Sequence, residues 1–140
     1  MSAATLDHLV RIHKALAHPV RVRIVAMLRG GEVCVCQLNA VIGLAPSTIS
    51  AHLGELKEAG LVAERKAGRW VHYRLAGEGG GAAALDALWP ALANDAQVAA
   101  DSALLAGVTA LPVEAICRPD FDLASLRASC CPRPKGRETR

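Results

Sequence analysis

The feature that most constrains the fold of this chain is a pair of short helical patterns that meet at Gly43 and precede a hairpin pattern. The spacing predicts one helix over about 33–42, stopped by the glycine, and a second over 46–60. Residues 62–66 and 71–75 alternate apolar and polar side chains, which predicts two strands. A helix, a tight turn and a second helix form the geometry that seats one helix in the major groove of DNA.

The remaining patterns predict a mainly α-helical protein. Apolar residues recur at helical spacing over 6–17 and 19–28, and again over 85–108, where Pro90 is expected to kink or break the helix. Hydrophobic residues make up 52% of the chain but aromatic residues only 3%. The core must therefore be aliphatic, which favours helices over a β-sandwich.

Charge is distributed unevenly along the chain. The formal charge is +5 over residues 1–75, −6 over 76–126 and +4 over 127–140. A basic first half indicates a polyanionic partner in that region. The chain has five cysteines, but its first residues do not have the pattern of a secretory signal peptide, and no apolar run is long enough to span a membrane. We therefore expect a cytoplasmic protein without membrane contact, whose thiols serve ligation or redox chemistry.

The second helix of the pair and the hairpin carry the candidate DNA contacts. Small hydrogen-bonding side chains on the helix can contact phosphates or base edges, and they are Ser47, Thr48, Ser50 and His52. Basic side chains near the hairpin tip can contact phosphates or the adjacent minor groove, and they are Arg65, Lys66 and Arg69. A solvated polar helix face is the alternative, but the order of helix, turn, helix and basic hairpin favours binding of duplex DNA.

Three runs resemble the ArsR/SmtB family of winged-helix metalloregulators, and they are GEVCVCQL, LAPSTISAHLGELKEAGLV and RKAGRWVHYRL. The resemblance covers about residues 5–105. It implies a winged helix-turn-helix with a two-stranded antiparallel wing, in a homodimeric repressor that leaves its operator on binding a metal ion or metalloid. We expect 1–105 to form the DNA-binding and dimerisation domain and 106–140 a flexible extension. Ala51 stands where relatives often carry a basic residue, and Ala45 where they often carry Ser.

Cys34-Val35-Cys36 is the expected metalloid site. Near a helix start the positive end of the dipole favours thiolates, which soft ions require. Residues two apart lie about 200° apart around an ideal helix, so chelation would require the helix start to unwind or shift. The resemblance implies As(III) or Sb(III) as inducer, often with a third cysteine three residues on, where this chain has Asn39. Two buried small residues are the alternative interpretation.

The remaining thiols are further candidate ligands. They are Cys117, Cys130 and Cys131. A vicinal pair in a tail can wrap a trivalent arsenical, and Cys117 could complete either cluster. The histidines lie at 8, 13, 18, 52 and 72, none beyond the wing, so the zinc site of the family's last helix is not expected. The phosphatase-like C-x5-R match from Cys131 to Arg137 holds two prolines at the chain end and is set aside.

Other functions remain open on the sequence alone. A repressor that senses Cd(II) or Pb(II) would use the same thiols. A thiol redox switch on DNA would use Cys34 and Cys36, or Cys130 and Cys131. An enzyme such as an arsenate reductase is the most distant alternative, and we expect no enzymatic activity. The dimer is expected to form through the first and last core helices.

Overall fold

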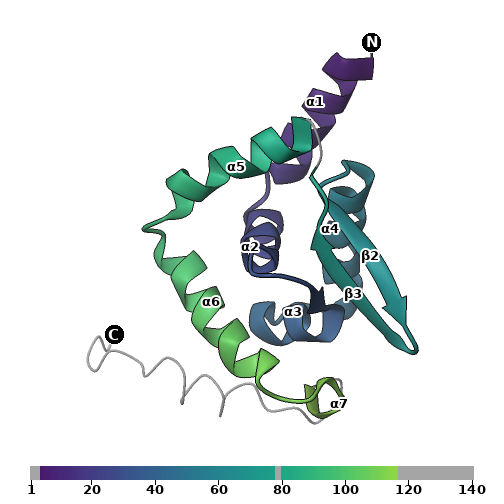
Figure 1. The fold of residues 1–140 in the computed structure, drawn as a ribbon, viewed down its shortest axis with the longest axis vertical. Coiled ribbons are helices and arrows are strands. Elements are labelled where there is room, and N and C mark those ends of the chain that lie inside the picture. The colour runs from purple at the N-terminus through teal and green to yellow at the C-terminus, as the bar shows by residue number, and fades with distance from the viewer. Residues whose placement is uncertain (1–3, 78–79, 117–140) are drawn as a thin grey trace, which may run out of the picture.

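The computed structural model describes residues 4–77 and 80–116, which form a mainly helical fold with one small sheet (Figure 1). The elements, in chain order, are α1 (Ala4–Leu16), α2 (Pro19–Leu28), β1 (Val33–Cys34), α3 (Val35–Ile42), α4 (Pro46–Glu58), β2 (Val62–Ala67), β3 (Trp70–Leu75), α5 (Gly80–Leu92), α6 (Ala96–Thr109) and α7 (Val113–Ile116). The predicted mainly helical fold is confirmed. No helix among these residues is long and apolar enough to cross a membrane.

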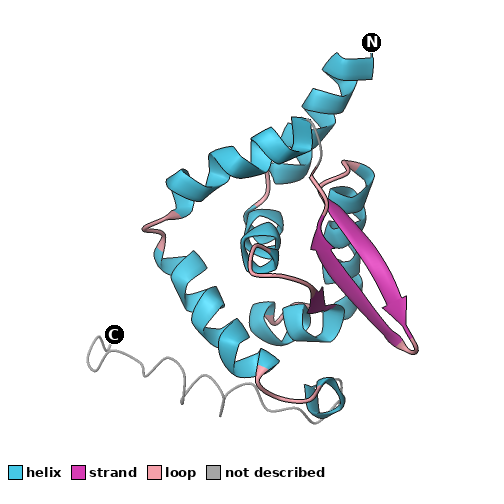
Figure 2. Ribbon diagram, in the orientation of Figure 1, coloured by secondary structure: helices cyan, strands magenta, loops and turns pink. Residues whose placement is uncertain are grey.

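The sheet contains the predicted hairpin and one strand that the sequence pattern missed (Figure 2). Strands β2 and β3 pair antiparallel and turn at Gly68, whose φ of 61° suits a residue without a Cβ. Strand β1 pairs antiparallel with the other side of β3, with Val33 opposite Tyr73 and Cys34 opposite His72. The predicted hairpin of two antiparallel strands is confirmed, and β1 joins its sheet as a third strand. The prediction of a helix starting near Val33 is corrected, because Val33 and Cys34 form β1 and α3 starts at Val35. Pairing with β3 takes these two residues out of the helix.

Helices α5, α6 and α7 form an arc along the side of α2 and α3 that lies away from the hairpin (Figure 1). Figure 1 shows α2 at the centre, α3 below it, and the hairpin beside α4. Helix α5 packs on α1, α6 packs on both α2 and α3, and α7 packs on α3. Helix α5 continues past Pro90 to Leu92, and the expected domain boundary at residue 105 falls inside α6.

The core is aliphatic, as predicted. Fully buried side chains come from α1, α2, α3 and α4 and include Ile12, Ile24, Leu38, Ile49 and Leu53. Leu104, Val108 and Ile116 bring α6 and α7 into the same cluster. Tyr73 is the one buried aromatic side chain of the described residues. Helices α3 and α4 thus pack on one continuous apolar core.

A buried ion pair fixes α6 to α2. Asp101 is 2% exposed and accepts two hydrogen bonds from Arg23, from Nε at 2.8 Å and Nη2 at 2.9 Å. Gln97 donates a third hydrogen bond to the same carboxylate. The hydrogen bond with Asp101 raises the pKa of Arg23, so this guanidinium stays charged.

Candidate nucleic-acid interface and thiol site

Helix α4 has an exposed polar face, and its opposite face is a buried apolar stripe. Gly43, with φ of 76°, ends α3 in the left-handed conformation and gives the sharp turn between the two helices. Ala45 offers no side-chain cap, and Pro46 starts α4 with the backbone angle that a first turn needs. Ile49, Leu53 and Leu56 are buried. Exposed hydroxyl groups lie on the opposite face, at Ser47, Thr48 and Ser50.

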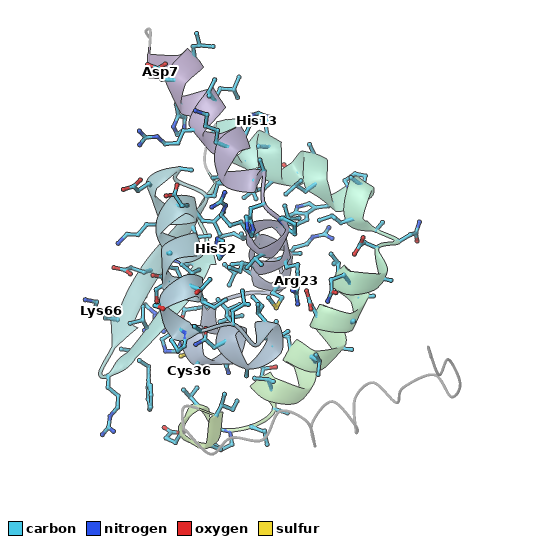
Figure 3. All side chains as sticks on the ribbon, turned by 180° about the vertical axis from the view of Figure 1, so that it is seen from behind. Asp7, His13, Arg23, Cys36, His52 and Lys66 are labelled. Carbon is cyan, nitrogen blue, oxygen red and sulfur yellow. The ribbon has the colours of Figure 1, made fainter. Side chains whose placement is uncertain are left out.

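His52 lies apart from these hydroxyl groups, at the junction of α4 with the start of α2 (Figure 3). Its ring is half-buried against that of His18, with the centroids 4.4 Å apart. His18 caps α2, because its Nδ1 accepts a hydrogen bond from the amide of Val20 at 3.1 Å. Burial first, then His18 and Arg21, lower the pKa of His52 and favour its neutral form. His52 is thus in contact with the residue that caps α2.

The wing carries basic side chains of two kinds. Lys66 and Arg69 are exposed at the hairpin tip, and Figure 3 shows Lys66 on the outer side of the hairpin. The guanidinium of Arg69 lies 5.7 Å from the ring centroid of Trp70. Arg65 instead donates hydrogen bonds to Glu32, with Nε 3.1 Å from Oε2, and lowers the pKa of that carboxyl. The pattern gave no local signal for Glu32, which lies in the loop before β1.

The two central cysteines occupy different environments. Cys34 is 1% exposed, in extended backbone at the N-cap of α3, and its amide donates to Oε1 of Gln37 at 2.9 Å. Cys36 lies in the first turn of α3, half-buried against the core (Figure 3). The premise that both thiols sit on one ideal helix is therefore wrong. Cys36 is one half of a disulfide, whereas Cys34 is a free thiol, so the two do not pair with each other.

The described residues contain no preassembled metal site around these cysteines. Within residues 4–77 and 80–116, no three His, Cys, Asp or Glu side chains are grouped to hold a metal ion. The candidate ligands Cys117, Cys130 and Cys131 lie outside the described residues. Asn39 Oδ1 is buried without a hydrogen-bond partner in the described part of the chain.

Comparison with known proteins places this architecture among bacterial regulators. Residues 18–64 match the family model described as "Bacterial regulatory protein, arsR family". Over 65 residues the chain is 43% identical to the arsenic resistance transcriptional regulator ArsR1 of Pseudomonas putida, covering 46% of this chain and 51% of that protein. The arsenical resistance operon repressor of Escherichia coli is 45% identical over 67 residues, covering 47% and 57%.

Other relatives carry different names. The biofilm growth-associated repressor of Agrobacterium fabrum is 41% identical over 63 residues, covering 45% of this chain and 54% of that protein. The matches thus span about half the length of these curated relatives. A solved homodimeric winged helix-turn-helix fragment from Mycobacterium bovis, titled a possible ArsR-family regulator, is 39% identical with a TM-score of 0.56. That match covers 66% of this chain and 84% of the fragment.

Proposed function

Since the chain belongs to the ArsR family of bacterial regulatory proteins, we propose that it is a repressor that leaves its operator when As(III) or Sb(III) binds to Cys34 and Cys36. The observation that carries this proposal is the position of the two cysteines at the junction of β1 and α3. This junction adjoins both the helix-turn-helix pair and the wing. Arsenical-resistance repressors among the relatives support the choice of inducer.

DNA binding would use the exposed face of α4 and the tip of the wing. Ser47, Thr48 and Ser50 would contact bases or phosphates in the major groove, and Lys66 and Arg69 would contact the flanking phosphates. Arg65 would contribute less, because Glu32 already neutralises its charge. His52 would act indirectly by holding α4 against the start of α2.

Strand β1 gives a physical route from the thiols to the DNA contacts. Its residues pair with β3 of the wing, and its last residue, Cys34, is the N-cap of α3, the first helix of the helix-turn-helix. A ligand that pulls Cys34 toward Cys36 would therefore disturb the wing and α3 together. A hundredfold loss of operator affinity needs a coupling free energy of about 2.7 kcal/mol between the two sites. The ion must bind the free protein more tightly than the DNA-bound protein by that amount.

A third thiolate would come from Cys117, Cys130 or Cys131. Ile116, the residue before Cys117, is buried in α7, which packs on the helix that carries Cys36. The chain therefore enters its last segment close to α3. Cd(II) and Pb(II) would be held by the same thiols and stay alternative inducers.

A redox switch is a second candidate function, and the disulfide at Cys36 favours it. Oxidation would then hold Cys36 in its disulfide, and reduction would restore its thiol. The switch would not use a bond between Cys34 and Cys36, because Cys34 is free. Peroxide would release the operator under this function, whereas arsenite would have no effect on the oxidised protein.

The decisive test replaces both cysteines with serine. Cys34→Ser/Cys36→Ser should keep operator affinity within a few fold, because neither side chain lies on the exposed face of α4. It should no longer leave the operator with arsenite, since the thiolate ligands are gone. Fluorescence anisotropy of a labelled operator with the protein reduced beforehand, titrated with arsenite, antimonite, cadmium, lead and peroxide, measures both properties.

Truncation before Cys130 is the matched control. The arsenite release curve should shift to higher concentration if Cys130 and Cys131 belong to the inducing site, and should stay in place if they do not. Release of the double serine variant at the wild-type arsenite concentration would show that sensing belongs to the other thiols.

A further inference from the structure

An open-sided cavity of about 840 Å³ lies between the end of α2, the loop over residues 29–32 and the helices α5 and α6. Its wall includes the apolar side chains of Met27, Leu92, Val98 and Leu105. The volume falls in the range of about 300–1,000 Å³ that is usual for sites that hold small organic molecules. Neither cysteine of the proposed inducer site lines this cavity, so a molecule bound here would be a second and separate ligand.

Three charged side chains line the cavity, and two of them already have partners. Glu32 accepts a hydrogen bond from Arg65, with Oε2 3.1 Å from Nε. Asp95 accepts one from the amide of Val98 at 2.9 Å, at the N-terminus of α6, whose positive dipole end stabilises a carboxylate. Arg29 takes part in no ion pair within the described residues. The charge that remains available to a ligand is therefore positive.

Trp89 holds the guanidinium of Arg29 at the edge of the cavity. The guanidinium carbon lies over the indole ring, 4.7 Å from the centroid, and both side chains line the cavity. The ring attracts the charge of the guanidinium and leaves N–H donors for a carboxylate, which arginine binds through a fork of two hydrogen bonds. A cation that is already held in place loses less conformational freedom when a ligand pairs with it.

From this arrangement we infer that the cavity binds a small organic carboxylate with an apolar body. The carboxylate pairs with Arg29, and the apolar body lies against Met27 and Leu105. The ligand also contacts the loop whose Glu32 pairs with Arg65 of the wing, so it would act as a second effector of the regulator. The inference goes beyond the proposed function and does not depend on the binding of arsenite.

Calorimetric titration of the full-length protein with octanoate tests the charge and the apolar body separately. Octanoate should bind, octan-1-ol should bind about tenfold more weakly because it has no charge for the guanidinium, and inorganic phosphate should not displace octanoate. Arg29→Gln should lower octanoate affinity about fivefold to tenfold, the usual effect of one charge-assisted hydrogen bond. Arg29→Lys keeps the charge but loses the fork, so its affinity should lie between the two.

The matched control is Arg74→Gln. Arg74 lines a neighbouring hollow of about 550 Å³ together with Arg29 and Trp89, but it does not line the larger cavity. This variant should therefore keep its octanoate affinity. Ala106→Leu adds bulk at a lining position of α6 and should abolish binding. Ala103→Leu, at an exposed position of the same helix outside the lining, should not.

Fluorescence gives the second readout and locates the ligand. Trp70→Phe leaves Trp89 as the only tryptophan of the chain, and octanoate should change its emission with the midpoint found by calorimetry. Equal affinity for octanoate and octan-1-ol would overturn the inference, as would equal losses in Arg29→Gln and Arg74→Gln or no binding at millimolar octanoate. If octanoate binds as expected but arsenite leaves the operator bound, the proposed function fails and this site stands.

Discussion

At the scale of single residues, the charge that a side chain offers to DNA depends on its neighbours in the fold. The sequence presents Arg65, Lys66 and Arg69 as equivalent basic residues of one hairpin. The structure separates them, because Arg65 is paired with Glu32 and the other two have no ion pair within the described residues. Lys66 and Arg69 therefore have their full charge available for phosphates, and Arg65 does not.

Replacing Lys66 and Arg69 with alanine should weaken binding to every duplex alike. Loss of two phosphate contacts per protomer should lower the slope of log K against log salt by about 1.8 per protomer. Anisotropy titrations at several salt concentrations, on an operator and on a random duplex, give both numbers. Arg65→Ala is the control and should change the slope less. Unchanged affinity for random DNA with collapse of operator affinity would instead assign sequence recognition to the wing.

At the scale of secondary structure elements, local patterns predicted well where local forces decide. Local sequence patterns were sufficient to predict α4 from its apolar stripe, the end of α3 from its glycine and the hairpin from its alternation. The pattern failed at Val33 and Cys34, which look like a helix start until β3 pairs with them. It also placed His52 with the outward residues, because nothing local reveals that His18 lies across from it. Long-range partners overrode the local preference at each of these positions.

The ion pair between α2 and α6 gives the element-scale prediction. Asp101→Ala removes both hydrogen bonds to Arg23, which is 22% exposed and so keeps some contact with water. We expect the free energy of unfolding to fall by about 1–3 kcal/mol, from a charge-assisted pair left half-satisfied in a partly buried site. Urea denaturation measures it. Gln97→Ala, which removes one neutral donor to the same carboxylate, should cost less. Equal losses would show that the hydrogen bonds from Arg23 add nothing to the stability of the fold.

At the scale of the whole molecule, α1 leaves an apolar face uncovered. Leu6, Leu9 and Val10 are 69%, 44% and 44% exposed. Large apolar side chains gathered on one exposed helix face are typical of an interface. We therefore propose that this face contributes to the homodimer that a near-palindromic operator requires, with two α4 helices about one DNA turn apart.

Sedimentation at micromolar concentration should show a dimer for the wild-type protein. Leu9→Glu/Val10→Glu should sediment as a monomer, because two buried carboxylates would oppose association. Its operator affinity should fall by more than tenfold while its circular dichroism stays helical, since neither side chain belongs to the buried core. Arg11→Gln, an exposed position on another side of the same helix, is the control. A wild-type protein that is a monomer and has full operator affinity would contradict the proposed dimer.

The burial of Cys34 in a two-residue strand affects the rate at which the protein responds to a ligand, rather than its affinity for that ligand. A thiol that is 1% exposed cannot meet a ligand from solution until β1 separates from β3. Short strands open locally without unfolding of the whole domain. At high arsenite concentration the waiting time for that opening would set the speed of release, and adding more arsenite would not shorten it. Under the proposed arsenite response, the response time at high doses would then depend on the two residue pairs that join β1 to β3, and not on the dose.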